Sequence, residues 1–316
     1  MPNPSSRRLR GVTTAFLSAA AILMAGCDGG PTVLEDVDVE VRSVVTSGDS
    51  RTFRLYHPPT LGRSGAAPLV LVYHGATQSA AGIEQMSWMY PAARDGGVRV
   101  AYLEATGDYW STPASPPIYW PVDDMGYTGA VIDALVAEGL VDPTRVYATG
   151  FSNGAVFVER LACSLQDRIA AVAVVGASMS RDLAAGCRLH RPVPALFFLG
   201  DADNQFFWDD GFAANFFQYG GQGSADWWAD EAGCGPRPEV THVPDTVDDG
   251  TTTEVWSYSG CRNGGDFRFY RIRGGGHTWP GSPLGGGGVL GPQSLELDAS
   301  REMVEFFLQY RRPEAG

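Results

Sequence analysis

The sequence predicts an α/β fold: a single domain with a central, mostly parallel sheet flanked by helices. Short, continuous apolar runs recur through the middle of the chain, which is typical of strands buried on both faces of a parallel sheet. Patterns of helical period separate these runs, and strands that alternate with helices form parallel sheets with crossover connections. The 316 residues, of which 44% are hydrophobic, are enough for a sizeable core in one domain.

The individual elements follow from these patterns. The expected buried strands are 68–75, 98–105, 145–150, 169–177 and 194–201, and the expected helices lie near 80–95, 124–139 and 153–166. Period-two alternation predicts an N-terminal hairpin from 37–45 and 51–58 and another strand at 267–273. A closing helix is expected in 294–312, with core contacts from Leu295, Leu297, Met303, Val304, Phe307 and Leu308. The loop-rich segments 106–122 and 204–266 are aromatic and Gly-rich, and they are expected to be substrate-side insertions rather than a second domain.

The N-terminus has the pattern of an export signal. Three arginines precede an apolar run, 12–26, that is too short for a good membrane span. The run ends in "LMAGC", which resembles a bacterial lipobox with Met24 in place of the usual Leu, so Cys27 is the expected lipidation site. We therefore expect a lipoprotein signal peptide at 1–26, a tether at 27–36 and the folded domain at 37–312. The alternatives are a plain signal peptide cleaved nearby and a twin-arginine signal.

Charge narrows the possible partners. The formal net charge is −13, and it becomes −16 without residues 1–26, which carry three arginines and no acid. Such an acidic chain is a poor partner for nucleic acid, so membrane contact is expected only through a lipid anchor at Cys27. We expect a monomer that is exported and is either lipid-anchored at the cell envelope or secreted. All 23 basic residues are Arg, which excludes a Ser–Lys dyad, a Schiff-base lysine and a P-loop lysine.

Four cysteines remain beside Cys27, and an even number in an exported protein indicates disulfides. Three pairings are possible. Local pairing closes the shorter loops and is therefore the pairing we expect, Cys163 with Cys187 and Cys234 with Cys261. No C-x-x-C spacing and no zinc-like interval between Cys and His exists in the sequence, so no metal is expected.

Ser152 lies in "RVYATGFSNGAVFVERLAC", at the junction between an expected strand and an expected helix. Serine is an ordinary helix cap, but the G-x-S-x-G spacing in this context also predicts a nucleophile elbow. Gly150 and Gly154 would allow the sharp turn. The N–H of Asn153 would then point at the place where an oxyanion forms.

A nucleophilic serine needs a base and an acid. Of the five histidines, His277 in "GGGHTWPG" lies after the last expected strand, where the order Ser, acid, His of the α/β-hydrolases requires the base. His74 comes too early and is expected to bond its own loop. Asp201 and Asp203 directly follow the strand 194–201, and either residue could be the acid. A calcium loop at "DADN" is excluded because Phe206 occupies the position that needs Gly.

The second oxyanion donor is expected from the loop "YHGATQ", where the N–H of Ala76 or Thr77 would complement that of Asn153. Aromatic residues in the two insertions could stack on an aromatic acyl group or could simply cover the core. The substrate-binding candidates are Trp110, Trp120, Phe207, Trp208 and Trp279, with Tyr109 and Tyr119 nearby.

Taken together, these motifs resemble the secreted esterases that include feruloyl esterases and polyhydroxybutyrate-depolymerase-like enzymes, carbohydrate esterase family one. The match runs from about residue 50 to 311. "HGATQSAAGI" is similar to the family's "HGCTQ" segment, "GFSNGA" to its elbow, and "GGGHTWPG" to its histidine block. "LGDAD" aligns with the family's "HGTAD", which implies that Asp203 is the acid; Leu199 and Asp201 depart from that pattern.

The resemblance implies an α/β-hydrolase fold and a serine esterase that needs no cofactor. Its expected triad is Ser152, Asp203 and His277. The implied substrates are small or oligomeric esters with feruloyl, other aromatic or hydroxyalkanoate groups. The alternatives are an acetyl-xylan deacetylase and a catalytically inactive binding lipoprotein on the same fold. The loop "NQFFWDDGF" differs from the family's turn after the acid, so the choice of ester stays open.

Overall fold

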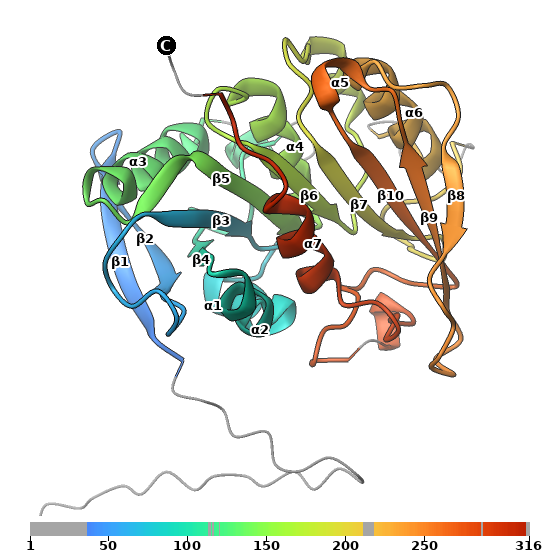
Figure 1. The fold of residues 1–316 in the computed structure, drawn as a ribbon, viewed down its shortest axis with the longest axis horizontal. Helices are drawn as coiled ribbons and strands as arrows, with labels where there is room; N and C mark the ends of the chain where they lie inside the picture. The colour runs from blue at the N-terminus through green and yellow to red at the C-terminus, as the bar shows by residue number, and fades with distance from the viewer. Residues whose placement is uncertain are drawn as a thin grey trace, which may run out of the picture. The chain divides into compact units, whose positions relative to one another are not determined.

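The computed structural model describes residues 37–313 except 113–114, 116, 120, 211–217 and 286. The expected leader and tether, including Cys27, lie outside the described residues. Within them, one sheet has the strand order β1-β2-β4-β3-β5-β6-β7-β10-β9-β8 (Figure 1). Its strands are β1 (Val39–Thr46), β2 (Asp49–Tyr56), β3 (Ala67–Tyr73), β4 (Arg99–Leu103), β5 (Val141–Phe151), β6 (Ala171–Val175), β7 (Ala195–Gly200), β8 (Glu239–His242), β9 (Thr252–Tyr258) and β10 (Phe267–Arg273).

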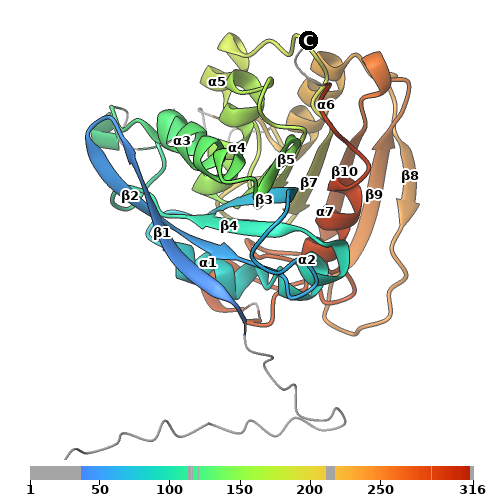
Figure 2. The same cartoon turned by 60° about the vertical axis from the view of Figure 1, so that its left-hand side comes forward.

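The middle of the sheet is parallel and its two edges are antiparallel. Strands β4, β3, β5, β6, β7 and β10 pair in parallel. The hairpin β1–β2 joins one side through β4, and β9–β8 joins the other side through β10 (Figure 2). This arrangement confirms the expected N-terminal hairpin and the buried central strands, which the apolar runs identified.

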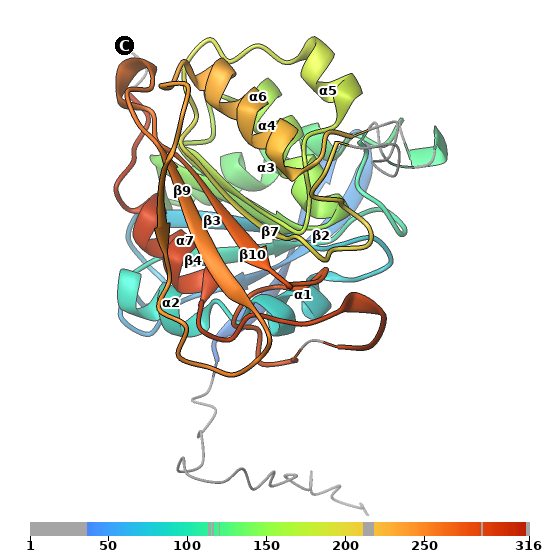
Figure 3. The same cartoon turned by 90° about the vertical axis from the view of Figure 1, so that its right-hand side faces the viewer.

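Helices cover both faces of the sheet because the central strands are apolar on both sides. Leu69, Leu71 and Tyr73 of β3 face one core, and Val70 and Val72 face the other. The first core lies under α3 (Asp124–Ala137), α4 (Asn153–Ser164), α5 (Arg181–Gly186) and α6 (Gly221–Ala232). The second lies under α1 (Ala80–Ser87), α2 (Tyr90–Gly96) and α7 (Ala299–Phe307) (Figure 3).

The C-terminal part of the chain differs from the expectation in two ways. The loop-rich segment 204–266 also forms α6, β8 and β9, for which the sequence pattern predicted no elements. The closing helix is shorter than expected because Asp298 caps its first turn by accepting the Arg301 N–H at 3.0 Å. Leu295 therefore lies outside α7 and is 51% exposed, while Leu308, just beyond its end, is 38% exposed.

Both disulfides have the expected pairing. Cys163–Cys187 joins the end of α4 to the end of α5, and Cys234–Cys261 joins the chain after α6 to the turn after β9. Each therefore ties a helix on one face of the sheet to a neighbouring segment. In the described part of the chain, no helix has the length and apolar character needed to cross a membrane.

Candidate active site

Ser152 stands between β5 and α4 in a conformation that few non-glycine residues adopt. Its φ is 54° and its ψ is −122°. A Cβ atom on Gly150 would lie 2.6 Å from the Gly154 carbonyl carbon, and one on Gly154 would lie 2.4 Å from the carbonyl oxygens of Tyr73 and His74. Only glycines fit at these two positions, so the turn is as sharp as the G-x-S-x-G motif predicts. Backbone strain of this kind costs about 1–3 kcal/mol and concentrates at functional sites.

His277 and Asp203 meet although their positions in the chain are 74 apart. Asp203 follows β7 and His277 follows β10, and these strands are parallel neighbours whose carboxyl ends share one edge of the sheet. His277 Nδ1 lies 2.7 Å from Asp203 Oδ2. The other oxygen, Oδ1, accepts the N–H groups of Gln205 at 2.8 Å and Phe206 at 3.0 Å. Together these three hydrogen bonds hold the Asp203 carboxylate in one orientation.

Asp201 has different partners. Its Oδ2 pairs with the Arg271 guanidinium at 3.0 Å, and its Oδ1 accepts the Gly274 N–H at 2.7 Å. The backbone N–H of Asp201 also donates to the Ile272 carbonyl at 2.9 Å. Asp201 thus joins the loop after β7 to the start of the loop that carries His277.

The imidazole of His277 is 2% exposed. Its ring centroid lies 4.7 Å from that of Phe151 and 5.7 Å from that of Phe206. Phe151 directly precedes Ser152, so the base lies over the strand end that carries the serine. Within the described residues, no hydrogen bond joins the Ser152 hydroxyl to His277.

Backbone hydrogen bonds distinguish Ala76 from Thr77, the two candidates for the second oxyanion donor. A hydrogen bond from the Gln78 N–H to the Gly75 carbonyl closes a tight turn, and Thr77 has a φ of 61° in it. The Thr77 N–H donates to the Asp108 carbonyl at 2.7 Å, so the Thr77 alternative is wrong. The Ala76 N–H has no partner among the described residues, and it remains the candidate with Asn153, the first residue of α4.

His74 and Trp110 hold the loop that carries Ala76. His74 Nδ1 donates to the Gly75 carbonyl at 2.8 Å, and Nε2 accepts the Ala105 N–H at 3.1 Å, which fits the expected loop-bonding role. Trp110 is fully buried, and its indole N–H donates to the His74 carbonyl at 2.9 Å. The prediction that Trp110 binds substrate is therefore wrong, because its ring has no free face.

The remaining aromatic candidates differ in exposure. Trp279 is 1% exposed and donates its indole N–H to Ser300 Oγ, and Trp208 is 8% exposed and packs against Trp256, Phe269 and the Arg271 guanidinium. Neither ring is available for stacking, which corrects both predictions. Phe207 is half-buried, and Trp120 lies outside the described residues.

Tyr109 and Tyr119 form a half-buried pair. From the sequence they were named only as neighbours of the substrate-binding candidates. Their ring centroids are 5.1 Å apart. The pair lies beside the oxyanion loop, because Tyr109 follows Asp108, whose carbonyl accepts the Thr77 N–H.

The Asn153 side chain has a role that the motif did not reveal. Its Oδ1 accepts the Trp110 N–H at 2.8 Å, and its Nδ2 donates to Ser115 Oγ at 2.9 Å. The residue after the serine therefore fixes the loop around Trp110 over the elbow. Because the partners lie about 40 positions away in the chain, sequence spacing carried no signal for them.

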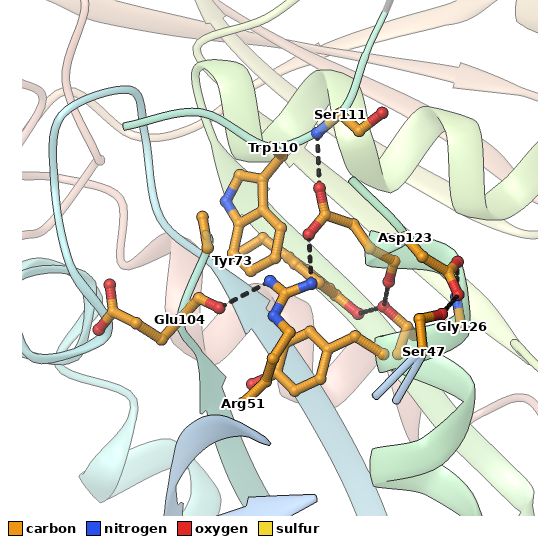
Figure 4. Close-up of polar contacts among 12 residues, drawn as sticks. Ser47, Arg51, Tyr73, Glu104, Trp110, Ser111, Asp123 and Gly126 are labelled. Carbon is orange, nitrogen blue, oxygen red and sulfur yellow. Dashed lines mark hydrogen bonds and ion pairs between the residues drawn. The ribbon is translucent and has the colours of Figure 1, made fainter. Parts of the chain in front are cut away.

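A buried ion pair also holds the loop around Trp110 (Figure 4). Arg51 of β2 contacts Asp124 of α3 at 2.7 Å, and Asp124 accepts the Ser111 N–H at 2.7 Å. Arg51 also donates to the Glu104 carbonyl at 3.0 Å. Burial raises the pKa of Asp124 even though Ser111 and Arg51 oppose that shift. The pair links β2, α3 and the chain after β4.

Glu159 lies on α4, seven positions after Ser152, and its side chain is fully buried. Burial raises its pKa to about 8. The carboxyl lies beside the Trp228 indole N–H, but its oxygens make no hydrogen bond of normal geometry. The helix behind the elbow thus holds an acid without a charged partner. In the described part of the chain, no group of three or more His, Cys, Asp and Glu side chains could hold a metal ion.

Solved structures share the fold of this chain. An acetyl xylan esterase from Aspergillus awamori matches with a TM-score of 0.52 and 17% identity, over 76% of this chain and 94% of that one. A thermostable esterase matches with a TM-score of 0.54 and 15% identity, over 87% of this chain and 63% of that one. At these identities the likeness concerns the fold alone, and it confirms the predicted α/β-hydrolase fold.

Sequence relatives give the family. A putative esterase, NocK, from Nocardia uniformis subsp. tsuyamanensis is 30% identical over 301 residues, which cover 86% of this chain and 83% of the relative. The chain therefore belongs to the family of this esterase. Feruloyl esterase B of Piromyces equi is 30% identical over 224 residues, 67% of this chain and 40% of that protein. No protein-family model matches the chain.

Proposed function

We propose that this chain is a serine esterase that hydrolyses carboxylic esters through Ser152, His277 and Asp203. The observation that carries the proposal is the 2.7 Å hydrogen bond between His277 Nδ1 and Asp203 Oδ2, next to a serine held on a strained elbow. Nucleophile, acid and base follow the carboxyl ends of β5, β7 and β10, which lie at one edge of the parallel part of the sheet. Membership of an esterase family supports the reaction class.

In the acylation step, His277 Nε2 accepts the Ser152 hydroxyl proton while Oγ attacks the ester carbonyl carbon. The N–H groups of Ala76 and Asn153 stabilise the oxyanion, and each is expected to contribute roughly 10²–10³ in rate. The intermediate collapses with loss of the alcohol, which takes the proton from His277. Asp203 keeps the imidazole in the Nδ1–H tautomer and stabilises the imidazolium.

In the deacylation step, His277 removes a proton from water, and the resulting nucleophile attacks the acyl-serine. A second tetrahedral intermediate releases the carboxylic acid and returns the proton to Ser152. The free structure lacks a hydrogen bond between Ser152 and His277, and catalytic hydrogen bonds are often long before substrate binds.

The test is hydrolysis of p-nitrophenyl acetate and butyrate by the wild type and by Ser152→Ala. We expect the variant to lose kcat by a factor on the order of 10⁴–10⁶, with a residual rate from the oxyanion donors. Ser43→Ala, the same change on the exposed strand β1, is the matched control and should keep full activity. If the wild type is no faster than Ser152→Ala, the enzyme proposal fails and the inactive binding lipoprotein is the better interpretation.

For the ester itself, we propose an aromatic acyl group over a hydroxyalkanoate or an acetyl-xylan substrate. Support comes from the half-buried Tyr109–Tyr119 pair beside the oxyanion loop and from the similarity to a feruloyl esterase. Methyl ferulate, acetylated xylan and hydroxybutyrate oligomers should be compared on purified protein. Tyr109→Ala should raise KM for methyl ferulate and leave KM for p-nitrophenyl acetate nearly unchanged; equal effects on both substrates would argue against stacking.

We also propose that the chain is exported and lipid-anchored at Cys27. The support is the lipobox-like "LMAGC" after a short apolar run. Mass spectrometry of the N-terminal peptide should find a diacylglyceryl-modified Cys27, and Cys27→Ala should release the protein from the membrane fraction. An unmodified N-terminus after cleavage elsewhere would favour the plain signal peptide.

A further inference from the structure

Among the described residues, Phe206 stands outside the proposed triad and yet contacts both its acid, Asp203, and its base, His277. Its ring stacks on the His277 imidazole with centroids 5.7 Å apart and planes inclined by 10°. Its backbone N–H donates to Asp203 Oδ1 at 3.0 Å. The residue is 9% exposed, so the ring is largely fixed in this place.

These contacts leave the imidazole little freedom. Phe151 packs against it with centroids 4.7 Å apart, and a Cβ atom on Gly176 would lie 3.2 Å from its Nδ1 and Cε1 atoms. Asp203 holds the Nδ1 edge. Phe206 supplies the remaining defined contact, a parallel stack. Rotation of the imidazole about its bond to Cβ would therefore collide with a phenyl ring or break the hydrogen bond to Asp203.

The phenyl ring also shields the contact between the proposed base and acid. It excludes water from the His277–Asp203 hydrogen bond, and that bond is stronger in a less polar surrounding. Loss of the ring would therefore both free the imidazole to rotate and weaken the hydrogen bond that orients it.

We propose that Phe206 is a positioning residue that holds the His277 imidazole in register with Asp203 during catalysis. This inference rests on the proposed function. It assigns a role to the position where the sequence departs from the family turn, so Phe206 is more than a cover for the core.

The test compares Phe206→Leu, which keeps the backbone N–H and most of the apolar volume, with Phe206→Tyr, which keeps the ring. With p-nitrophenyl acetate we expect Phe206→Leu to lower kcat about tenfold, which corresponds to about 1.4 kcal/mol, with KM within about twofold. Phe206→Tyr should restore at least half of the wild-type kcat. In ¹H NMR spectra, the downfield resonance of the His277 Nδ1 proton should broaden in the Leu variant and return in the Tyr variant.

Phe306→Leu is the matched control, because it removes another buried ring, on α7, away from the triad. It should lower Tm and leave kcat unchanged. If Phe206→Leu keeps wild-type kcat and an unchanged Nδ1 resonance, Phe206 only packs and the inference is overturned. That failure is distinct from failure of the proposed function, in which Ser152→Ala would be as active as the wild type.

Discussion

Asp201 and Asp203 are two positions apart, yet their carboxylates have unrelated partners. Asp203 contacts His277, whereas Asp201 contacts Arg271 and the Gly274 N–H. Both follow the same strand, so the residues alone left the two alternatives open. The turn at Gln205 and Phe206, whose N–H groups bind Asp203, makes the difference. Hydrogen bonds of this kind, between a side chain and nearby backbone N–H groups, depend on the exact turn. A pattern of apolar residues does not predict them.

Asp203→Asn should lower kcat on the order of 10³–10⁴-fold, because an amide in this position favours the wrong tautomer of His277. Asp201→Asn should lower it by no more than about fivefold, since its pair with Arg271 is partly exposed and such pairs contribute about 1 kcal/mol or less. Steady-state kinetics of both variants checks the assignment. Equal losses would contradict it.

At the scale of the element, the elbow depends on two glycines packed against backbone. Gly154→Ala should abolish soluble, folded protein, because the new methyl group would lie 2.4 Å from two carbonyl oxygens that cannot move aside. Gly129→Ala in α3 is the matched control, since nothing lies within 4 Å of its added methyl group. There alanine should stabilise the helix by up to about 1 kcal/mol. Yield and Tm measure both effects.

The helix after the elbow gives a prediction about pH. The pKa of Glu159 is about 8 in the folded protein against 4.5 as its ordinary value. Between these values the folded state holds a proton that the unfolded state releases, so the free energy of unfolding falls as pH rises from about 4.5 to 8. In Glu159→Gln this decline should be weaker. Tm at several pH values measures it.

Glu305→Gln, on the exposed face of α7, is the control for loss of one carboxylate. Its Tm should follow that of the wild type at every pH. If the Tm of Glu159→Gln fell with rising pH as steeply as that of the wild type, the buried carboxyl would not be the source of the pH dependence.

Elements differed in how well the sequence predicted them, for physical reasons. The strand β10 was predicted at its observed bounds, because alternating residues face core and solvent. The helix α6 was missed since its sequence, GQGSADWWADEA, contains two glycines and has low intrinsic helix propensity. Burial of Trp228 against the sheet stabilises it, which is a tertiary effect that a local pattern does not contain.

At the scale of the whole molecule, the two disulfides close loops on one face of the sheet. Loop closure predicts about 3 kcal/mol of stabilisation for the Cys163–Cys187 bridge, with a sequence separation of 24. Replacing both cysteines by alanine should therefore lower Tm strongly. Strong reductant should lower the Tm of the wild type and leave the Tm of a variant lacking all four cysteines unchanged. Denaturation curves with and without reductant test this.

The sequence predicted the molecule best where chain order and pattern coincide. The elbow at Ser152 and the loop of His277 each follow a strand, as the glycine-flanked motifs predicted. The aromatic candidates were predicted poorly, because hydrophobic rings look alike whether they cover a core or line a surface. Trp110, Trp208 and Trp279 became core residues only once the packing was known.

The neighbouring positions of β7 and β10 bear on the timing of folding. Asp201 N–H bonds to the Ile272 carbonyl and Ala202 N–H to the Gly275 carbonyl, so the two loops that carry the proposed acid and base are joined only after β10 has entered the sheet beside β7. Synthesis must reach the last fifth of the chain before the pair exists. During refolding, catalytic activity should accordingly return after helical circular dichroism, and ester turnover would report completion of the sheet.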